Sequence, residues 1–100
     1  MRHFVYSIYD SASGIYMRPF VAATDQMASR SFTDIANDAN HEIGRHPEDY
    51  TLFRLGLFDD NTGTIEPEAP TKVINALEAI AASQKVDGAQ LQAFDAQVAN

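Results

Sequence analysis

The chain has 100 residues, of which 45% are hydrophobic and 21% are charged, a composition typical of a single globular domain with one modest core. It contains no cysteine, which excludes disulfide bonds and cysteine-ligated zinc or iron–sulfur sites and is consistent with a reducing compartment. Its apolar runs are only a few residues long and its N-terminus alternates, which argues against a membrane span and a secretory signal, so we expect a cytoplasmic protein without membrane contact.

The net charge of −7 is spread unevenly along the chain. Residues 1–58 carry five arginines and seven acidic residues, whereas residues 59–100 carry two lysines and seven acidic residues. Nine of the ten aromatic residues also lie in residues 1–58. We therefore predict a core domain over residues 1–70, followed by an acidic, alanine-rich helical tail over residues 71–100 that belongs to the same domain or serves dimerisation. The acidic total argues against strong nonspecific binding to duplex phosphates.

The N-terminal part of the chain has the pattern of two strands. Residues 3–9 alternate and consist of β-forming residue types, which predicts a strand with one apolar face. A polar turn that ends at Gly14 separates it from a second predicted strand, residues 15–22, so the two form an antiparallel hairpin. Pro19 has no backbone N–H to donate, which places the second strand at a sheet edge or breaks it at Pro19.

A helical period replaces the alternation at Thr24. Thr24 is a suitable N-cap, and Asp25 stands in the first turn, where the helix dipole favours an anion. We predict a helix over residues 24–38 that covers one face of the sheet. The residues that share its apolar face are Ala28, Phe32, Ile35, Ala36 and Ala39.

The C-terminal half predicts further strands and helices. Residues 41–50 form a connector in which Pro47 starts a short helix, and residues 51–59 form a third strand. Residues 64–68 read as a short returning strand, and a helix follows from Thr71. A weaker helical pattern with Leu91, Phe94 and Val98 closes the chain.

These elements indicate an α+β fold, with a small antiparallel sheet of three or four strands packed against one main helix and an alanine-rich helical segment at the C-terminus. The apolar residues expected to form much of the core are Phe4, Tyr6, Ile8, Phe32, Ile35, Phe53, Leu55 and Leu57.

The acidic residues between His46 and Gly63 are the first candidates for chemistry. His46, Glu48 and Asp49 suggest a metal site, but Pro47 breaks the spacing that helical zinc motifs need. Residues 59–64 resemble the start of a calcium loop, yet Thr64 and Pro70 stand where an EF-hand requires Gly and Glu. We interpret these acids as turn and helix-start residues, with Gly63 in a positive-φ turn, and predict no metal and no cofactor.

Catalytic motifs are also missing from the sequence. It holds no nucleophile elbow, phosphate-binding loop or dinucleotide fingerprint, and only two lysines, Lys72 and Lys85. We therefore expect a protein that is not an enzyme.

Aromatic and arginine side chains on or beside the predicted strands are the remaining candidates. Aromatic rings interleaved with guanidinium groups on a sheet face form a platform on which single-stranded bases stack. The competing interpretation is that aromatic residues on the strands of a small domain belong to the core. The candidate nucleic-acid-binding residues are Arg2, Tyr6, Tyr16, Arg18, Phe53 and Arg54.

Four stretches resemble one family. YSIYDSASGIY (6–16) with PF (19–20), SRSFTDIAND (29–38) and HPEDYTLFRLGLFDDNTG (46–63) are similar, in this order, to the small nonstructural protein of gokushovirus-type microviruses, which are icosahedral single-stranded DNA phages. That family is commonly described as DNA-binding, or as a switch from duplex replication to single-stranded genome synthesis for packaging. The resemblance extends from about residue 4 to residue 66.

The resemblance implies a bacteriophage accessory protein that acts in viral genome synthesis and packaging, in the cytoplasm of the bacterial host. One hypothesis is weak binding to single-stranded DNA through stacking and a few arginines. The other is a protein-interaction or scaffold-like module without nucleic-acid contact, with the acidic tail as a docking surface. Its partners would then be the viral replication initiator, the procapsid or a second copy in a homo-oligomer.

Overall fold

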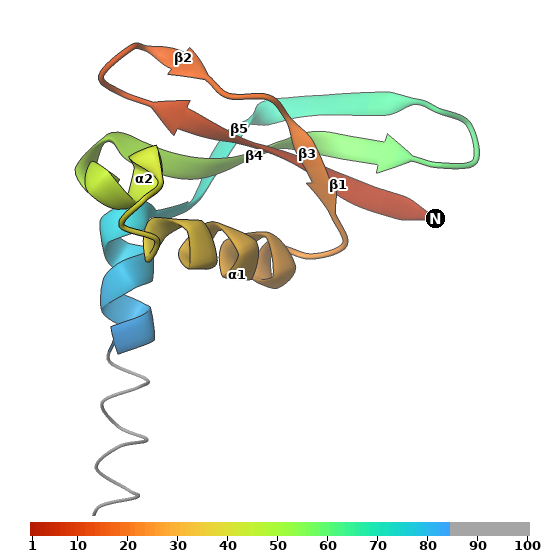
Figure 1. Ribbon diagram of the computed structural model, residues 1–100. Coiled ribbons are helices and arrows are strands. Elements are labelled where there is room, and N and C mark those ends of the chain that lie inside the picture. The colour runs from red at the N-terminus through yellow and green to blue at the C-terminus, as the bar shows by residue number, and fades with distance from the viewer. Residues whose placement is uncertain (85–100) are drawn as a thin grey trace, which may run out of the picture.

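The computed structural model describes residues 1–84. Five strands form one antiparallel sheet, and the helices cover one of its faces (Figure 1). The strand order is β2-β1-β4-β5, and β3 also pairs with β1. The predicted α+β class is confirmed, with one strand more than the three or four expected. The strands are β1 Arg2–Asp10, β2 Ile15–Tyr16, β3 Phe20–Ala22, β4 Tyr50–Asp59 and β5 Ile65–Asn75.

The predicted strand over residues 15–22 is divided into β2 and β3. Residues 17–19 between them make no ladder, in keeping with the missing N–H of Pro19. Both short strands pair with β1, with Tyr9 opposite Tyr16 and Val5 opposite Val21. The break at Pro19, one of the two alternatives read from the sequence, is therefore confirmed.

The helices are α1 Asp25–Ala36, α2 Glu42–Arg45, the 3-10 helix η1 Pro47–Asp49 and a last helix over residues 76–84. The Thr24 side chain accepts a hydrogen bond from the Met27 N–H at 3.1 Å, which confirms the predicted N-cap. Helix α1 ends two residues before the predicted boundary, and Ala39 is exposed beyond it. The predicted helix start at Pro47 is confirmed.

The prediction of a short strand at 64–68 and a helix from Thr71 was wrong. Strand β5 continues to Asn75, because the β-branched Ile74 pairs with Leu52 and packs against the core. Asn75 then ends the strand and starts the helix. Its amide donates to the Tyr50 carbonyl at 3.1 Å, and its side-chain oxygen accepts from the Leu77 N–H at 2.8 Å. Residues 71–75 therefore belong to the sheet, and the weaker helical pattern near Leu91 lies outside the described residues.

The core lies between the sheet and the helices. Tyr6, Ile8 and Phe32 of the predicted core are buried, and Phe4 and Ile35 pack against the buried cluster at its margin. The other buried members are Ala28, Ala36, Ile43, Tyr50, Leu52, Ala76 and Ala79.

The assignment of Phe53, Leu55 and Leu57 to the core was wrong, because none of the three belongs to the buried cluster. Leu57 pairs with Phe4 on the helix side but lies outside that cluster, whereas the positions of Phe53 and Leu55 follow from a bulge in β4. Val5 pairs with Gly56 while Tyr6 pairs with Arg54, so Leu55 is an extra residue without a partner on β1. The bulge changes which residues of β4 face the helices, and Leu52 takes the buried position opposite Ile8.

Candidate nucleic-acid interface

The sheet has two faces of different chemistry. We call the face toward α1 the inner face and the opposite one the outer face. Directly paired residues of an antiparallel sheet share a face, and successive residues alternate, so the register assigns each strand residue to a side. The outer-face residues are His3, Val5, Ser7, Tyr9, Tyr16, Val21, Thr51, Phe53, Gly56, Phe58, Ile65, Pro67, Lys72 and Asn75.

Three aromatic rings meet on the outer face near β2. The ring centroids of Tyr9 and Tyr16 are 4.8 Å apart, those of Tyr16 and Phe53 are 5.8 Å apart, and those of Tyr9 and Phe53 are 6.2 Å apart. The rings meet in tilted or edge-to-face arrangements, which aromatic pairs favour. Tyr16 is 42% exposed, so this aromatic cluster offers ring surface to solvent.

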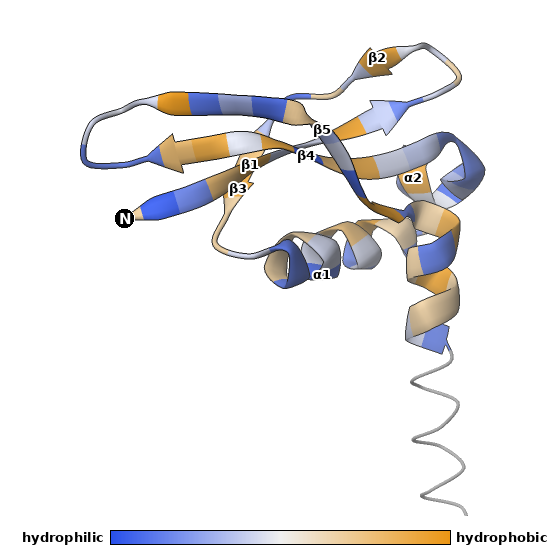
Figure 2. Ribbon diagram, turned by 180° about the vertical axis from the view of Figure 1, so that it is seen from behind, coloured by the Kyte–Doolittle hydropathy of each residue, from blue (hydrophilic) through white to orange (hydrophobic). Residues whose placement is uncertain are grey.

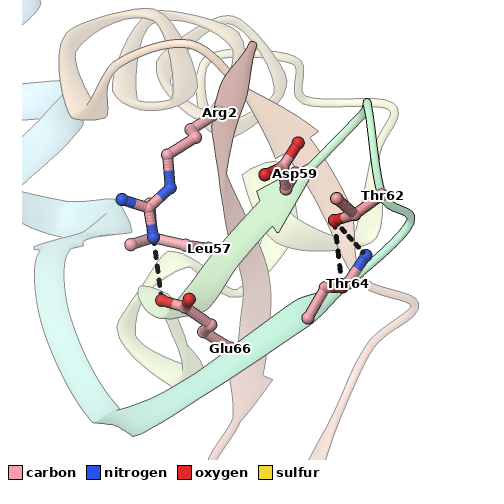
Figure 3. A pocket seen from close by; sticks show the side chains of 6 residues that line it. All are labelled: Arg2, Leu57, Asp59, Thr62, Thr64 and Glu66. Carbon is pink, nitrogen blue, oxygen red and sulfur yellow. Dashed lines mark hydrogen bonds and ion pairs between the residues drawn. The ribbon is translucent and has the colours of Figure 1, made fainter.

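Two arginines hold the acidic side chains of β5 and the first acid of α1 on the inner side. The Arg2 guanidinium lies 2.8 Å from Glu66 (Figure 3). Arg54 lies 2.7 Å from Glu68 and 3.0 Å from Asp25. These contacts neutralise carboxylates on the side of the sheet that the helices share.

The outer-face residues of the strands include no carboxylate. Among these outer-face residues, Lys72 is the one permanent cation. Its ammonium group lies 2.6 Å from the Glu78 carboxylate of the helix 76–84, at the margin of the face. His3 contacts Asp60 of the β4–β5 turn at 3.2 Å. The outer face is therefore largely aromatic and apolar, and within residues 1–84 the acids paired with its residues, Asp60 and Glu78, stand outside the strands.

The structure divides the six predicted site residues between the two faces. Tyr16 and Phe53 lie together in the aromatic cluster, and Arg18 is exposed between β2 and β3. Tyr6 is fully buried on the inner face, whereas Arg2 and Arg54 are engaged there by the acids described above. The six do not form one surface.

Tyr9 is the member of the aromatic cluster that was not predicted. The alternation of residues 3–9 carried the signal, because a strand that turns Tyr6 and Ile8 to the core turns Tyr9 the other way.

A buried phenol anchors the inner side of this strand. The Tyr6 hydroxyl donates to Asp25 Oδ1 at 2.6 Å, and burial followed by this hydrogen bond raises the Tyr6 pKa. Arg54 also lies 5.1 Å from the centroid of the Phe4 ring, a cation–π geometry. Arg54 and Tyr6 therefore fix α1 to the sheet, which leaves the outer face as the open side.

The acidic turn residues have structural roles. The Asp59 side chain accepts from the Asn61 N–H at 2.9 Å, and Gly63 has a φ of 73°, which confirms the turn interpretation. A small hollow beside this turn, drawn in Figure 3, contains the Arg2–Glu66 pair. Within residues 1–84, no three His, Asp or Glu side chains gather in a way that could hold a metal ion. No helix in the same range is long and apolar enough to cross a membrane.

Comparisons with known proteins place the chain in a phage family. The family model described as Phage ORF5 protein matches residues 3–79, which include all of the outer face and every strand residue except Arg2. Protein ORF5 of Chlamydia phage 1 is 32% identical over 71 residues, which cover 67% of this chain and 74% of that protein. No solved structure matches. The chain thus belongs to the Phage ORF5 protein family, and its resemblance to the small nonstructural protein of gokushovirus-type microviruses is confirmed.

Proposed function

We propose that this phage protein binds single-stranded DNA weakly through the outer face of its sheet, during viral genome synthesis and packaging in the host cytoplasm, and that it is not an enzyme. The observation that carries the proposal is the separation of chemistry across the sheet. The aromatic cluster lies on a face whose strand residues include no acid, whereas Glu66, Glu68 and Asp25 are ion-paired on the other side. The net charge of −7 therefore does not describe the surface that would meet DNA.

The chemistry of this face suits bases better than phosphates. Stacking of a base on an aromatic side chain contributes roughly 1–3 kcal/mol and tolerates any base. Arg18 is exposed and takes part in no ion pair within residues 1–84, so it is available to a phosphate. With so few cations, binding would be weak, tolerant of sequence and only shallowly dependent on salt.

The test is a fluorescence-anisotropy titration of a labelled single-stranded oligonucleotide, with a duplex control, at low and near-physiological salt. We expect micromolar binding of the single strand, little binding of the duplex, and loss of binding in Tyr16→Ala. Tyr16→Phe is the matched variant, because it keeps the ring and should keep the affinity. No binding of either DNA at low salt would reject the proposal.

A protein-interaction role is the second candidate, because the same face exposes aliphatic side chains. Val21 is 53% exposed and Ile65 is 61% exposed, and such residues are common at protein interfaces when they lie together. The partner would be a second copy, the replication initiator or the procapsid. Sedimentation velocity of the purified protein distinguishes a dimer from a monomer. A protein that stays monomeric at high concentration and binds DNA would favour single-stranded DNA binding over the protein-interaction role.

A further inference from the structure

We propose that a single strand crosses the outer face between two base-binding stations, the aromatic cluster and a second, apolar hollow near the β4–β5 turn, with Arg18 at the backbone between them. This inference rests on the proposed function and deepens it, because it assigns the hollow to the same DNA strand.

The hollow has the size and character of a site for one flat apolar group. Its volume is about 220 Å³, below the roughly 300–1,000 Å³ of pockets that take drug-sized ligands. In Figure 2 the end of β4 and the start of β5 are coloured as hydrophobic, and each contributes one residue to the lining. Phe58 and Pro19 supply rings, and Val21 and Ile65 are more than half exposed. The lining residues are Val5, Pro19, Phe20, Val21, Phe58 and Ile65.

One short segment of chain joins the two stations. Residues 17–19 lead from Tyr16 of the aromatic cluster to Pro19 at the rim of the hollow. The segment is fixed to β1, because the Met17 N–H donates to the Ile8 carbonyl at 2.8 Å and the Ser7 hydroxyl donates to the Met17 carbonyl at 2.6 Å. Ser7 is only 1% exposed, so this anchor is shielded from water. Arg18 is thereby held between the stations.

The distance between the stations sets a minimum length of DNA. Tyr9 and Val5 are four residues apart on β1, which at about 3.4 Å per residue gives about 14 Å. That span matches about four steps between stacked bases, or about five nucleotides, at a spacing of about 3.4 Å per step. Oligonucleotides shorter than this reach one station only, and longer ones reach both.

The lining of the hollow predicts that it does not discriminate between DNA bases. Its six residues carry no polar side-chain atom, so no side-chain donor or acceptor can read a base edge. No acid lies among the strand residues between the two stations, so a phosphate near Arg18 meets no opposing carboxylate from the sheet. We therefore expect the hollow to accept any base, unlike a site that recognises one base by hydrogen bonds to its edge.

A length series of labelled oligothymidylates tests the second station. Trimers, hexamers, nonamers and dodecamers would be titrated against the full chain and its Val21→Glu variant. We expect Val21→Glu to weaken dodecamer binding about fivefold or more, the loss of one stacked base. Trimer affinity should not change. Ile65→Glu, at the opposite side of the hollow, should repeat the result, and thermal melting verifies that both variants fold.

Met27→Glu is the matched control, because Met27 is 57% exposed on α1 and the charge change is the same. If both hollow variants bind the dodecamer as Met27→Glu does, while Tyr16→Ala still abolishes binding, the second station is wrong and the proposed function stands. If Val21→Glu instead converts a dimer to a monomer in sedimentation velocity without changing DNA affinity, the hollow belongs to a second copy and the inference is overturned. Absence of binding at every length rejects both proposals.

Discussion

Tyr6 and Arg54 face each other across β1 and β4, and both reach the same carboxylate. The Tyr6 hydroxyl donates to Asp25 Oδ1 at 2.6 Å, and Arg54 Nη1 donates to Asp25 Oδ2 at 3.0 Å. Arg54 Nε also donates to Glu68 on β5 at 2.7 Å. One guanidinium therefore ties the first residue of α1 to the sheet and joins its two longest strands.

Loss of this guanidinium should destabilise the fold. We expect Arg54→Ala to lower the free energy of unfolding by about 2–3 kcal/mol, because it removes charge-assisted hydrogen bonds to Asp25 and Glu68 and leaves Asp25 with the Tyr6 hydroxyl alone. Urea unfolding followed by circular dichroism measures the change. Arg45→Ala is the matched control, because Arg45 is exposed and forms none of the ion pairs within residues 1–84, and it should change stability by less than about 0.5 kcal/mol. Equal effects of the two variants would contradict the structural role of Arg54.

Alkaline pH should weaken the fold through Tyr50. Burial, and next a hydrogen bond with Glu42, raises the pKa of Tyr50 to about 12, whereas an unfolded tyrosine titrates near 10. Above pH 10 the unfolded chain loses a proton that the folded protein retains, so the stabilisation is complete below pH 10 and is lost as the pH rises toward 12. Urea midpoints between pH 8 and 11.5 should fall more steeply for the wild type than for Tyr50→Phe. Parallel curves would show that Tyr50 titrates normally in the folded state.

The bulge in β4 requires glycine at position 56. A Cβ atom there would lie 2.3 Å from the backbone oxygen of Glu66, which cannot move without displacing β5. We expect Gly56→Ala to cost about 3 kcal/mol, the upper end of the usual range for overpacking. Gly63→Ala should cost only about 1–2 kcal/mol, because that site has open space and a positive φ alone. The reverse order in urea unfolding would contradict the observed pairing of β4 with β5.

Two phenylalanines test which residues form the core. Phe32 is 1% exposed in the buried cluster, so Phe32→Ala should lower stability by about 3–5 kcal/mol. Phe53 is only partly buried on the outer face, so Phe53→Ala should cost markedly less, although it should weaken DNA binding. Thermal melting of both variants makes the comparison, with a shift of roughly 4–8 °C per kcal/mol for a domain of this size. Equal losses would place Phe53 in the core, as the sequence had suggested.

Arg18 should carry part of the salt dependence of DNA binding. If its guanidinium neutralises one phosphate, Arg18→Ala reduces the slope of log affinity against log salt by about 0.7. Arg45→Ala removes an equal charge from the side of the molecule that carries α2, and the slope should not change. The measurement is the anisotropy titration at four salt concentrations, and identical slopes for the two variants would exclude a phosphate contact at Arg18.

Local patterns predicted the elements whose causes are local. The N-cap at Thr24, the turn at Gly63 and the break at Pro19 depend on the backbone chemistry of neighbouring residues, and all three are confirmed. The length of β5 depends on a partner elsewhere in the chain, because Ile74 extends the strand by pairing with Leu52. The bulge at Leu55 depends on pairing with β1 in the same way. Neither can be derived from the residues beside it.

The residues of the candidate site also depend on contacts that the local sequence does not reveal. Tyr16 and Phe53 were identified by residue type, but Tyr6 and Arg54 were included because the sequence does not say which face of the strands α1 covers. Once the covered face is known, alternation assigns Tyr9 to the aromatic cluster without further information.

Strand β5 forms one edge of the sheet, where unpaired backbone groups could recruit another chain and start aggregation. Pro67 and Pro70 each remove an N–H from this strand, whereas Glu66 and Glu68 beside them are ion-paired with Arg2 and Arg54. Two copies brought edge to edge would therefore lack two of the backbone donors that a new strand pairing needs. The two prolines of residues 66–70 thus make β5, the one long edge that the sheet presents within residues 1–84, a poor template for strand addition.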